Sequence, residues 1–289
     1  MREIDGQATL DVKVQAHALL AKAYERGNNG RLARQEYNKV LSAWKDPAAA
    51  ARAINEGADA ARAQRNLGRA LLAVGEAHFF FAEEKRAKVE AVSFPAYKGP
   101  GTKEAVLKHI NTKVKDWIQK KKPLIDDASA EYKKIVDLQP LPPPKWVIAG
   151  GARVGSMWAK FVEEFRAAPI PDAMSRDYEI RTAYYGALDD ASEPLKQIGK
   201  SAYKTCLEYS VTFQYFDEFS RSCEEWLAEN YKAEFHLIDE FSGAPNRVNN
   251  VLKEKPYPLK ANGDPMIISI DQALEQEQAK DQKGKKDQK

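Results

Sequence analysis

The sequence predicts an all-α fold, and three observations support this. Apolar residues recur every three or four positions over most of the chain, which is the period of a helix with one buried face. The alternation of apolar and polar residues that is typical of a half-buried strand is nearly absent. Glycine and proline gather in a few short stretches, such as 27–30, 99–101 and 169–171, which divide the chain into long helical segments.

The composition is that of a globular protein with one large domain or two ordinary ones. The chain has 289 residues, of which 30% are charged and 43% are hydrophobic, and its mean hydropathy is -0.59. Uncharged apolar runs such as 146–152 are much shorter than the roughly 18 to 20 residues of a membrane span. The 45 basic and 42 acidic residues give a net charge of only +3. We therefore expect no membrane insertion and no nucleic-acid partner.

The first helical hairpin is predicted between Ala16 and Pro47, with its turn at Gly27-Asn28-Asn29-Gly30. The residues on either side of this turn resemble tetratricopeptide repeat (TPR) proteins, in which small residues lie where the two helices of a hairpin cross. The matching residues are Ala21, Tyr24, Ala33, Tyr37 and Val40. The resemblance implies a TPR-like solenoid of antiparallel helical hairpins, and we assign residues 1–241 to it.

A second hairpin of this type is expected to be elongated into a projecting arm, about residues 62–139. Its matching residues are Leu71, Val74, Gly75 and His78 in the first helix, and Ala128, Tyr132, Ile135 and Pro140 at the second. If Gly75 faces Ala128, the midpoint between them falls beside Gly99-Pro100-Gly101, which we therefore place at the tip. About twenty extra residues per helix would extend the arm by roughly 30 Å.

Two more hairpins are predicted after the arm. Segments 145–167 and 172–190 flank Pro169-Ile170-Pro171, a turn that its prolines keep from being helical. A new helix is expected to begin at Ser192-Glu193-Pro194, with the serine as N-cap and the proline in the first turn. It would pair with a last helix over 216–230. Residues 242–289 are rich in proline, glycine and charge, and they predict an extended or disordered tail.

Two stretches have distinctive motifs: KWVIAGGARVG with FVEEFRAAPIP at 145–155 and 161–171, and YFDEFSRSCEEWL with FHLIDEF at 215–227 and 235–241. These motifs resemble those of TPR proteins of the myxobacterial adventurous gliding motility machinery. These motifs are helix-packing residues and carry no chemistry. The resemblance implies a periplasmic, non-enzymatic scaffold whose partners are the other proteins of a cell-envelope complex.

The compartment has an alternative, because the N-terminus lacks the apolar region of a signal peptide. A mature or trimmed periplasmic protein and a cytoplasmic protein both fit this observation. The cytoplasmic alternative is a TPR adaptor or co-chaperone that binds peptide termini through lysines in its groove.

The two cysteines, Cys206 and Cys223, are 17 residues apart. On one unbroken helix that spacing would separate them by about 25 Å, too far for a disulfide. If a turn near 212–215 divides the segment, they lie at nearly the same height on facing helices. A disulfide between them would fit an oxidising compartment, whereas two buried thiols are the alternative.

The arm carries a candidate partner-binding surface, because lysines greatly outnumber acidic residues between 102 and 122. Its predicted binding residues are Lys108, Lys113, Lys115, Trp117, Lys120 and Lys121. Such a surface suits an acidic protein, a glycan polymer or peripheral contact with an anionic membrane. The alternative is that the lysines only solvate the outer face of an exposed hairpin.

No residue pattern predicts catalysis, a metal site or a cofactor. The four histidines are scattered, and none has a second ligand four residues on. Adjacent carboxylates such as Glu163 and Glu164 point about 100° apart on a helix, which is poor geometry for paired-carboxylate catalysis. Gly150, Gly151 and Gly155 lack the Gly-Lys-Ser/Thr of a phosphate-binding loop. We therefore expect a protein that is not an enzyme and that binds neither metal nor cofactor.

Overall fold

The structure, a computed structural model, describes residues 8–56 and 58–237. Every regular element in these ranges is a helix, which confirms the predicted all-α class. Within the same ranges, no helix has the length and apolar character needed to cross a membrane. The predicted tail, 242–289, lies outside the described residues.

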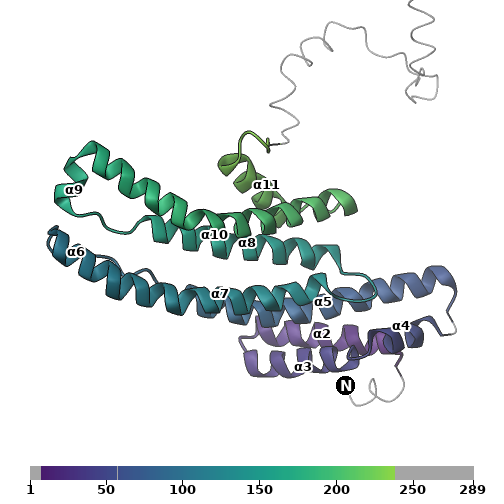
Figure 1. Ribbon diagram of the computed structural model, residues 1–289. Helices are drawn as coiled ribbons and strands as arrows, with labels where there is room; N and C mark the ends of the chain where they lie inside the picture. The colour runs from purple at the N-terminus through teal and green to yellow at the C-terminus, as the bar shows by residue number, and fades with distance from the viewer. Residues whose placement is uncertain (1–7, 57, 238–289) are drawn as a thin grey trace, which may run out of the picture. The chain divides into compact units, whose positions relative to one another are not determined.

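Helices α2 (Leu10–Arg26) and α3 (Gly30–Ala43) form the first hairpin at the predicted turn (Figure 1). Asn28 has a φ of 55°, and the side chain of Asn29 accepts a hydrogen bond from the backbone N–H of Leu32. Four of the five TPR-like residues of this hairpin are fully buried or nearly so: Ala21, Ala33, Tyr37 and Val40. A short helix that the sequence analysis did not predict, α4 (Pro47–Asn55), follows with Asp46 as its N-cap.

Helices α5 (Ala60–Glu90) and α7 (Lys115–Val136) form the second hairpin. Helix α6 (Lys103–His109) and a π-helical turn, η1 (Ile110–Val114), lead into α7. Hydrogen bonds fix the antiparallel register, from Lys85 to Asp127 at 2.9 Å and from Tyr132 to Glu83.

The connection between α5 and α6 is not helical, because Pro95 and Pro100 interrupt it. It continues from α5 towards the turn at 99–101 and lies alongside α7 and α6. Lys121 Nζ in α7 donates to the carbonyl of Val92 at 2.9 Å, and a ring nitrogen of His109 in α6 lies 2.9 Å from the carbonyl of Pro95. The chain turns at 99–101, close to where the sequence analysis placed the tip, and α6 begins two residues later.

The expected pairing of Gly75 with Ala128 is wrong. A Cβ atom added to Gly75 would lie 2.6 Å from atoms of Pro143 and Trp146, so this glycine marks a close contact with the next hairpin. The register differs because an extended residue advances about 3.3 Å whereas a helical residue advances 1.5 Å. The non-helical connection therefore covers the length of the second helix with fewer residues than a helix would need.

The second hairpin does not project alone, which corrects the prediction of a free arm. Helix α8 (Pro144–Arg166) packs on both α5 and α7. The ring of Trp117 stacks on that of Phe161 in α8, with 4.7 Å between the ring centroids. At the tip, the backbone N–H of Asp172 donates to the carbonyl of Gly101 at 2.9 Å.

The last helices are α9 (Asp172–Arg176), α10 (Tyr178–Phe213) and α11 (Glu218–Asn230). The predicted helix start at Ser192 is wrong, because α10 continues through Pro194 for 36 residues. Ser192 is fully buried, and its hydroxyl donates to the carbonyl of Asp189 and accepts from Arg166. The predicted turn at 212–215 is present, with Gln214 at a φ of 51°.

The helices pack in layers, with α5 and α7 between the other two sets (Figure 1). On one side α5 contacts α2, α3 and α4, and on the other side α8 packs on α5 and α7 while α10 packs on α8. Helix α11 packs on α8 and α10. Helix α5 therefore lies next to both α2 and α8, which are the first helices of the preceding and following hairpins. The candidate site lies across these three helices.

Candidate partner-binding surfaces

The six predicted binding residues of the second hairpin fall into two groups. Lys108, Lys113, Lys115 and Lys120 are exposed. Trp117 and Lys121 are only 3% and 2% exposed. The prediction that these two residues contact a partner is therefore wrong.

Trp117 and Lys121 hold the second and third hairpins together. The ring of Trp117 stacks on Phe161 and makes an edge contact with Phe94. Lys121 Nζ donates to a carboxylate oxygen of Glu164 in α8 at 2.5 Å. The burial of Lys121 could have been predicted from its spacing, because it falls at helical intervals within the series of buried residues Val114, Trp117, Ile125 and Ala128. A lysine at a core position of a helix usually has a charged partner.

A second surface, which the sequence analysis missed, is an apolar groove across α2, α5 and α8. It encloses a cavity of about 280 Å³. Two of its leucines are open to solvent: Leu19 is 69% exposed and Leu72 is 42% exposed. The full lining is Gln15, Ala18, Leu19, Arg69, Leu72, Ala73, Glu76, Lys145 and Trp146.

The aromatic wall of the apolar groove is held rigidly. Trp146 Nε1 donates to the backbone carbonyl of Leu72 at 2.8 Å. The indole also packs on the ring of Phe79, with 4.9 Å between the centroids. A partner would therefore meet a preformed surface and would not have to order this side chain, which lowers the entropy cost of binding.

The rim of the apolar groove has an excess of positive charge. Glu76 is paired with Lys22 at 2.8 Å. Neither Arg69 nor Lys145 forms an ion pair with any residue in 8–56 or 58–237, while Lys145 Nζ lies 4.6 Å from the centroid of the Trp146 ring. Two cations thus border a groove whose floor is apolar, which suits a segment with apolar side chains and nearby negative charge.

A sequence signal for this groove existed in α2. Val12 and Leu19 are seven residues apart and share one face of the helix, although only Leu19 lines the groove. They lie off the stripe of Val14, Ala18 and Ala21, which is buried. Large apolar residues on the outer face of one amphipathic helix indicate a binding surface only when neighbouring helices extend the apolar patch. The sequence did not show that Leu72 and Trp146 lie beside Leu19.

Cys206 of α10 and Cys223 of α11 form a disulfide in the structure, with 6.5 Å between their Cα atoms. Both are fully buried. They belong to a cluster in which α8, α10 and α11 meet, with Ile148 and Tyr203. Burial raises the pKa of Tyr203 to about 12.

Two carboxylates at helix contacts, Glu83 and Glu36, have structural partners. Glu83 accepts hydrogen bonds from Arg86 and Tyr132 and lies 3.2 Å from Arg153. Burial alone would raise the pKa of Glu83, but these partners hold it below the ordinary value. His17 and Glu36, 2.6 Å apart, join α2 and α3 in the same way. These groups connect helices.

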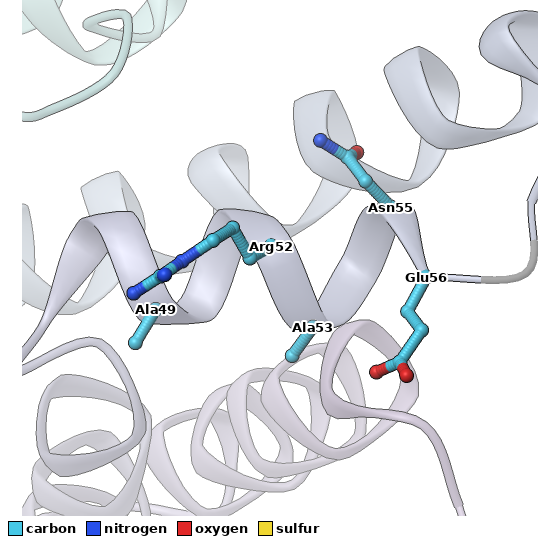
Figure 2. Close-up of a pocket in the computed structure, with 5 residues that line it drawn as sticks. All are labelled: Ala49, Arg52, Ala53, Asn55 and Glu56. Carbon is cyan, nitrogen blue, oxygen red and sulfur yellow. The ribbon is translucent and has the colours of Figure 1, made fainter.

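Other hollows lie on the described surface outside the apolar groove. One open depression is lined by Ala49, Arg52, Ala53, Asn55 and Glu56, all from α4 and the residue after it (Figure 2). In Figure 2 their side chains spread over the surface instead of pointing at a common centre. Another hollow, between α8, α10 and α11, has mixed charges and is lined by residues that include Glu163, Arg166 and Lys196. Among the residues described, no group of three His, Cys, Asp or Glu side chains could hold a metal ion.

Comparisons with protein-family models, curated proteins and solved structures give no match to this chain. The resemblances drawn from its residues therefore remain expectations. The function of the chain is inferred from the surfaces described above.

Proposed function

We propose that the protein is a non-enzymatic, TPR-like scaffold that binds partner proteins through the apolar groove. The observation that carries this proposal is the exposure of Leu19 and Leu72 beside a fixed indole ring, on three helices that belong to three successive hairpins. Burying a leucine side chain stabilises a complex by about 1.5–3 kcal/mol. Two exposed leucines beside a tryptophan therefore offer apolar surface that a bound peptide segment would bury.

The order of the helices supports the solenoid part of the proposal. In a stack of helical hairpins, each hairpin contacts only its neighbours, and equivalent helices line one face. Here the groove is lined by α2, α5 and α8, each the first helix of its hairpin. This is the face on which TPR-like solenoids hold extended segments of other proteins.

The site of action that we propose is a bacterial envelope complex of the gliding-motility type, in the periplasm. Its support is the sequence resemblance together with the Cys206–Cys223 disulfide, because disulfides persist mainly in oxidising compartments. The second candidate is a cytoplasmic adaptor that binds peptide termini. The two cations at the rim of the groove, Arg69 and Lys145, favour that candidate.

Replacing the exposed leucines tests the groove. We expect the double variant Leu19→Glu with Leu72→Glu to lose at least one protein that co-purifies with the wild type from chemically crosslinked source cells. Val136→Glu is the matched control, because Val136 is 37% exposed but lies on α7, outside the groove lining. Equal recovery of all partners by the three proteins, at equal melting temperatures, would refute the proposed use of the groove.

Trapping thiols in intact cells separates the two compartments. Both cysteines are fully buried, so the cells are quenched in acid and the protein is then alkylated in denaturant without reductant. Cys206 and Cys223 should stay unmodified if the protein is periplasmic, since both are held in the disulfide. Quantitative alkylation of both cysteines would favour the cytoplasmic adaptor.

A further inference from the structure

The tips of two neighbouring hairpins carry opposite charges. The basic tip, residues 98–122, has eight lysines and two acidic residues, a net charge of +6. The acidic tip, residues 172–193, has six acidic residues and two arginines, a net charge of −4. The hydrogen bond between Asp172 and Gly101 joins them, and Figure 1 shows α6 and α9 at the same end of the layers.

Among the described residues, few of these charges form ion pairs, although Asp177 caps α10 and Arg181 donates to the carbonyl of Ser175. The ion pairs that the described residues make at the two tips are Lys121–Glu164, Lys122–Asp126 and Arg166–Asp189. None of them connects one tip to the other. Most of the lysines and carboxylates at this end therefore face solvent and are available to another molecule.

The acidic tip extends beyond the helix that covers the rest of α10. Arg166, the last residue of α8, pairs with Asp189, so the eleven residues from Tyr178 to Leu188 run past the end of α8, a length of about 16 Å. Tyr184 is half-buried there and donates to the carbonyl of Pro169, but Tyr178, Ile180 and Tyr185 are 71%, 44% and 43% exposed.

The carboxylates of this segment form a stripe. Glu179 and Asp190 are eleven residues apart, which is close to three helical turns, and Glu193 is one turn further on. All three are exposed on the same side of α10. The basic tip contributes Lys113 and Lys120, which are exposed and seven residues apart, with the exposed Leu107 nearby on α6.

We propose that this end of the molecule binds a second copy of the chain. In a two-fold arrangement, the basic tip of each copy lies on the acidic tip of the other. Tyr178 and Tyr185, seven residues apart on one side of α10, supply apolar contact. An interface around a two-fold axis must complement itself, and a surface with both signs of charge does so. An acidic protein or an anionic membrane would be attracted by the basic tip but repelled by the acidic tip beside it.

Sedimentation velocity at low and high salt tests this proposal with the full chain. We expect a dimer at 50 mM salt whose dissociation constant rises about tenfold or more at 500 mM salt, because exposed charges are screened. A wild type that is monomeric at 50 mM salt and high protein concentration overturns the proposal. A monomer that binds vesicles of equal parts phosphatidylglycerol and phosphatidylcholine also overturns it, in favour of a membrane contact.

Charge reversal identifies the surfaces. The basic-tip variant is Lys113→Glu, Lys115→Glu and Lys120→Glu, and the acidic-tip variant is Glu179→Lys, Asp190→Lys and Glu193→Lys. Each variant alone should be monomeric, since like charges then meet across the two-fold axis. An equimolar mixture of the two should form a heterodimer, because both contacts then join opposite charges.

The control for the basic-tip variant is Lys45→Glu, Lys133→Glu and Lys232→Glu. It makes the same change in net charge as that variant, at exposed lysines outside the tips. It should dimerise like the wild type. If the control also dissociates, or if the mixed variants do not associate, the dimer does not form through these tips. The two tips and the apolar groove are separate surfaces, so either proposal can fail without the other.

Discussion

Burial separates residues of the same type in the basic tip. Lys120 is exposed, whereas its neighbour Lys121 is 2% exposed and bonded to Glu164 and to the carbonyl of Val92. A lysine in this position joins α7, α8 and the non-helical connection at one point. Its role is therefore in the stability of the fold, and the exposed lysines remain the ones that can meet a partner.

Truncation of Lys121 should be destabilising. Lys121→Ala leaves the Glu164 carboxylate, which is 19% exposed, and a backbone carbonyl without their donor. We expect the free energy of unfolding in urea to fall by about 2–3 kcal/mol. Lys120→Ala, the control one residue away, should leave it unchanged. Equal stability of the two variants would show that Lys121 is not a structural residue.

The pH dependence of stability should reflect Glu83. Its pKa lies below the ordinary value of 4.5 because the hydrogen bonds from Arg86 and Tyr132 outweigh the effect of burial. A carboxyl group with a lowered pKa stabilises the fold above its unfolded pKa, and this contribution is lost as the pH falls through the folded pKa. The free energy of unfolding should therefore decline below about pH 4.5. Chemical denaturation at several pH values should show a smaller decline for Glu83→Gln than for the wild type, and an equal decline would exclude this role.

Helix α5 makes a close contact with α8 at Gly75. A Cβ atom at Gly75 would lie 2.6 Å from Trp146, and the indole cannot move away without losing its hydrogen bond to Leu72. At Gly68, two turns earlier in the same helix, an added Cβ atom would meet no atom within 4 Å among the described residues. The two glycines therefore have different structural roles in one helix.

Alanine at these two glycines should change stability in opposite directions. Gly75→Ala should destabilise by about 1–3 kcal/mol through overpacking. Gly68→Ala should stabilise by about 0.5–1 kcal/mol, since alanine is the better helix former. Thermal unfolding of the two variants measures this difference, and a Gly75→Ala protein as stable as the wild type would mean that α5 and α8 are not in close contact.

The disulfide should stabilise the attachment of α11 to α10. Cross-linking two residues that close a loop of about 15 residues contributes roughly 3 kcal/mol, and here the separation is 17 residues. The double variant Cys206→Ala with Cys223→Ala should therefore melt at a lower temperature than the wild type, and reductant should lower only the wild-type value. If reductant has no effect on the wild type, the disulfide is not formed in solution.

Across the whole molecule, the sequence predicts helices and their local turns better than the contacts between hairpins. The turns at 27–30 and 99–101 are visible because glycine and proline mark them locally. The turn at 212–215 contains neither residue, and the sequence indicated it only as a condition for bringing the two cysteines together. Trp117 and Lys121 are buried because α8, which is distant in the chain, packs on them. Their spacing along α7 predicts that they lie on its buried face but does not identify the helix that covers them. The unbroken α10 was missed because Arg166 and the Ser192 hydroxyl support the helix around Pro194.

The apolar groove was missed for the same reason. Its residues come from three helices whose neighbourhood only the folded chain defines, and Leu19, Leu72 and Trp146 each look like ordinary helix residues by themselves. The opposite charges of the two tips, in contrast, are visible in the sequence, but their adjacency is not. Both proposed contact surfaces thus arise from packing between hairpins.

Site-specific photo-crosslinking in the source cells tests the central claim, that partners bind in the apolar groove, most directly. A photoreactive amino acid at Leu72 should give a discrete crosslinked protein, and adding Leu19→Glu should abolish it. The same photoreactive residue at Val136, which has similar exposure, should give no such product. Absence of a product at Leu72, or the same product from Leu72 and Val136, would contradict the claim.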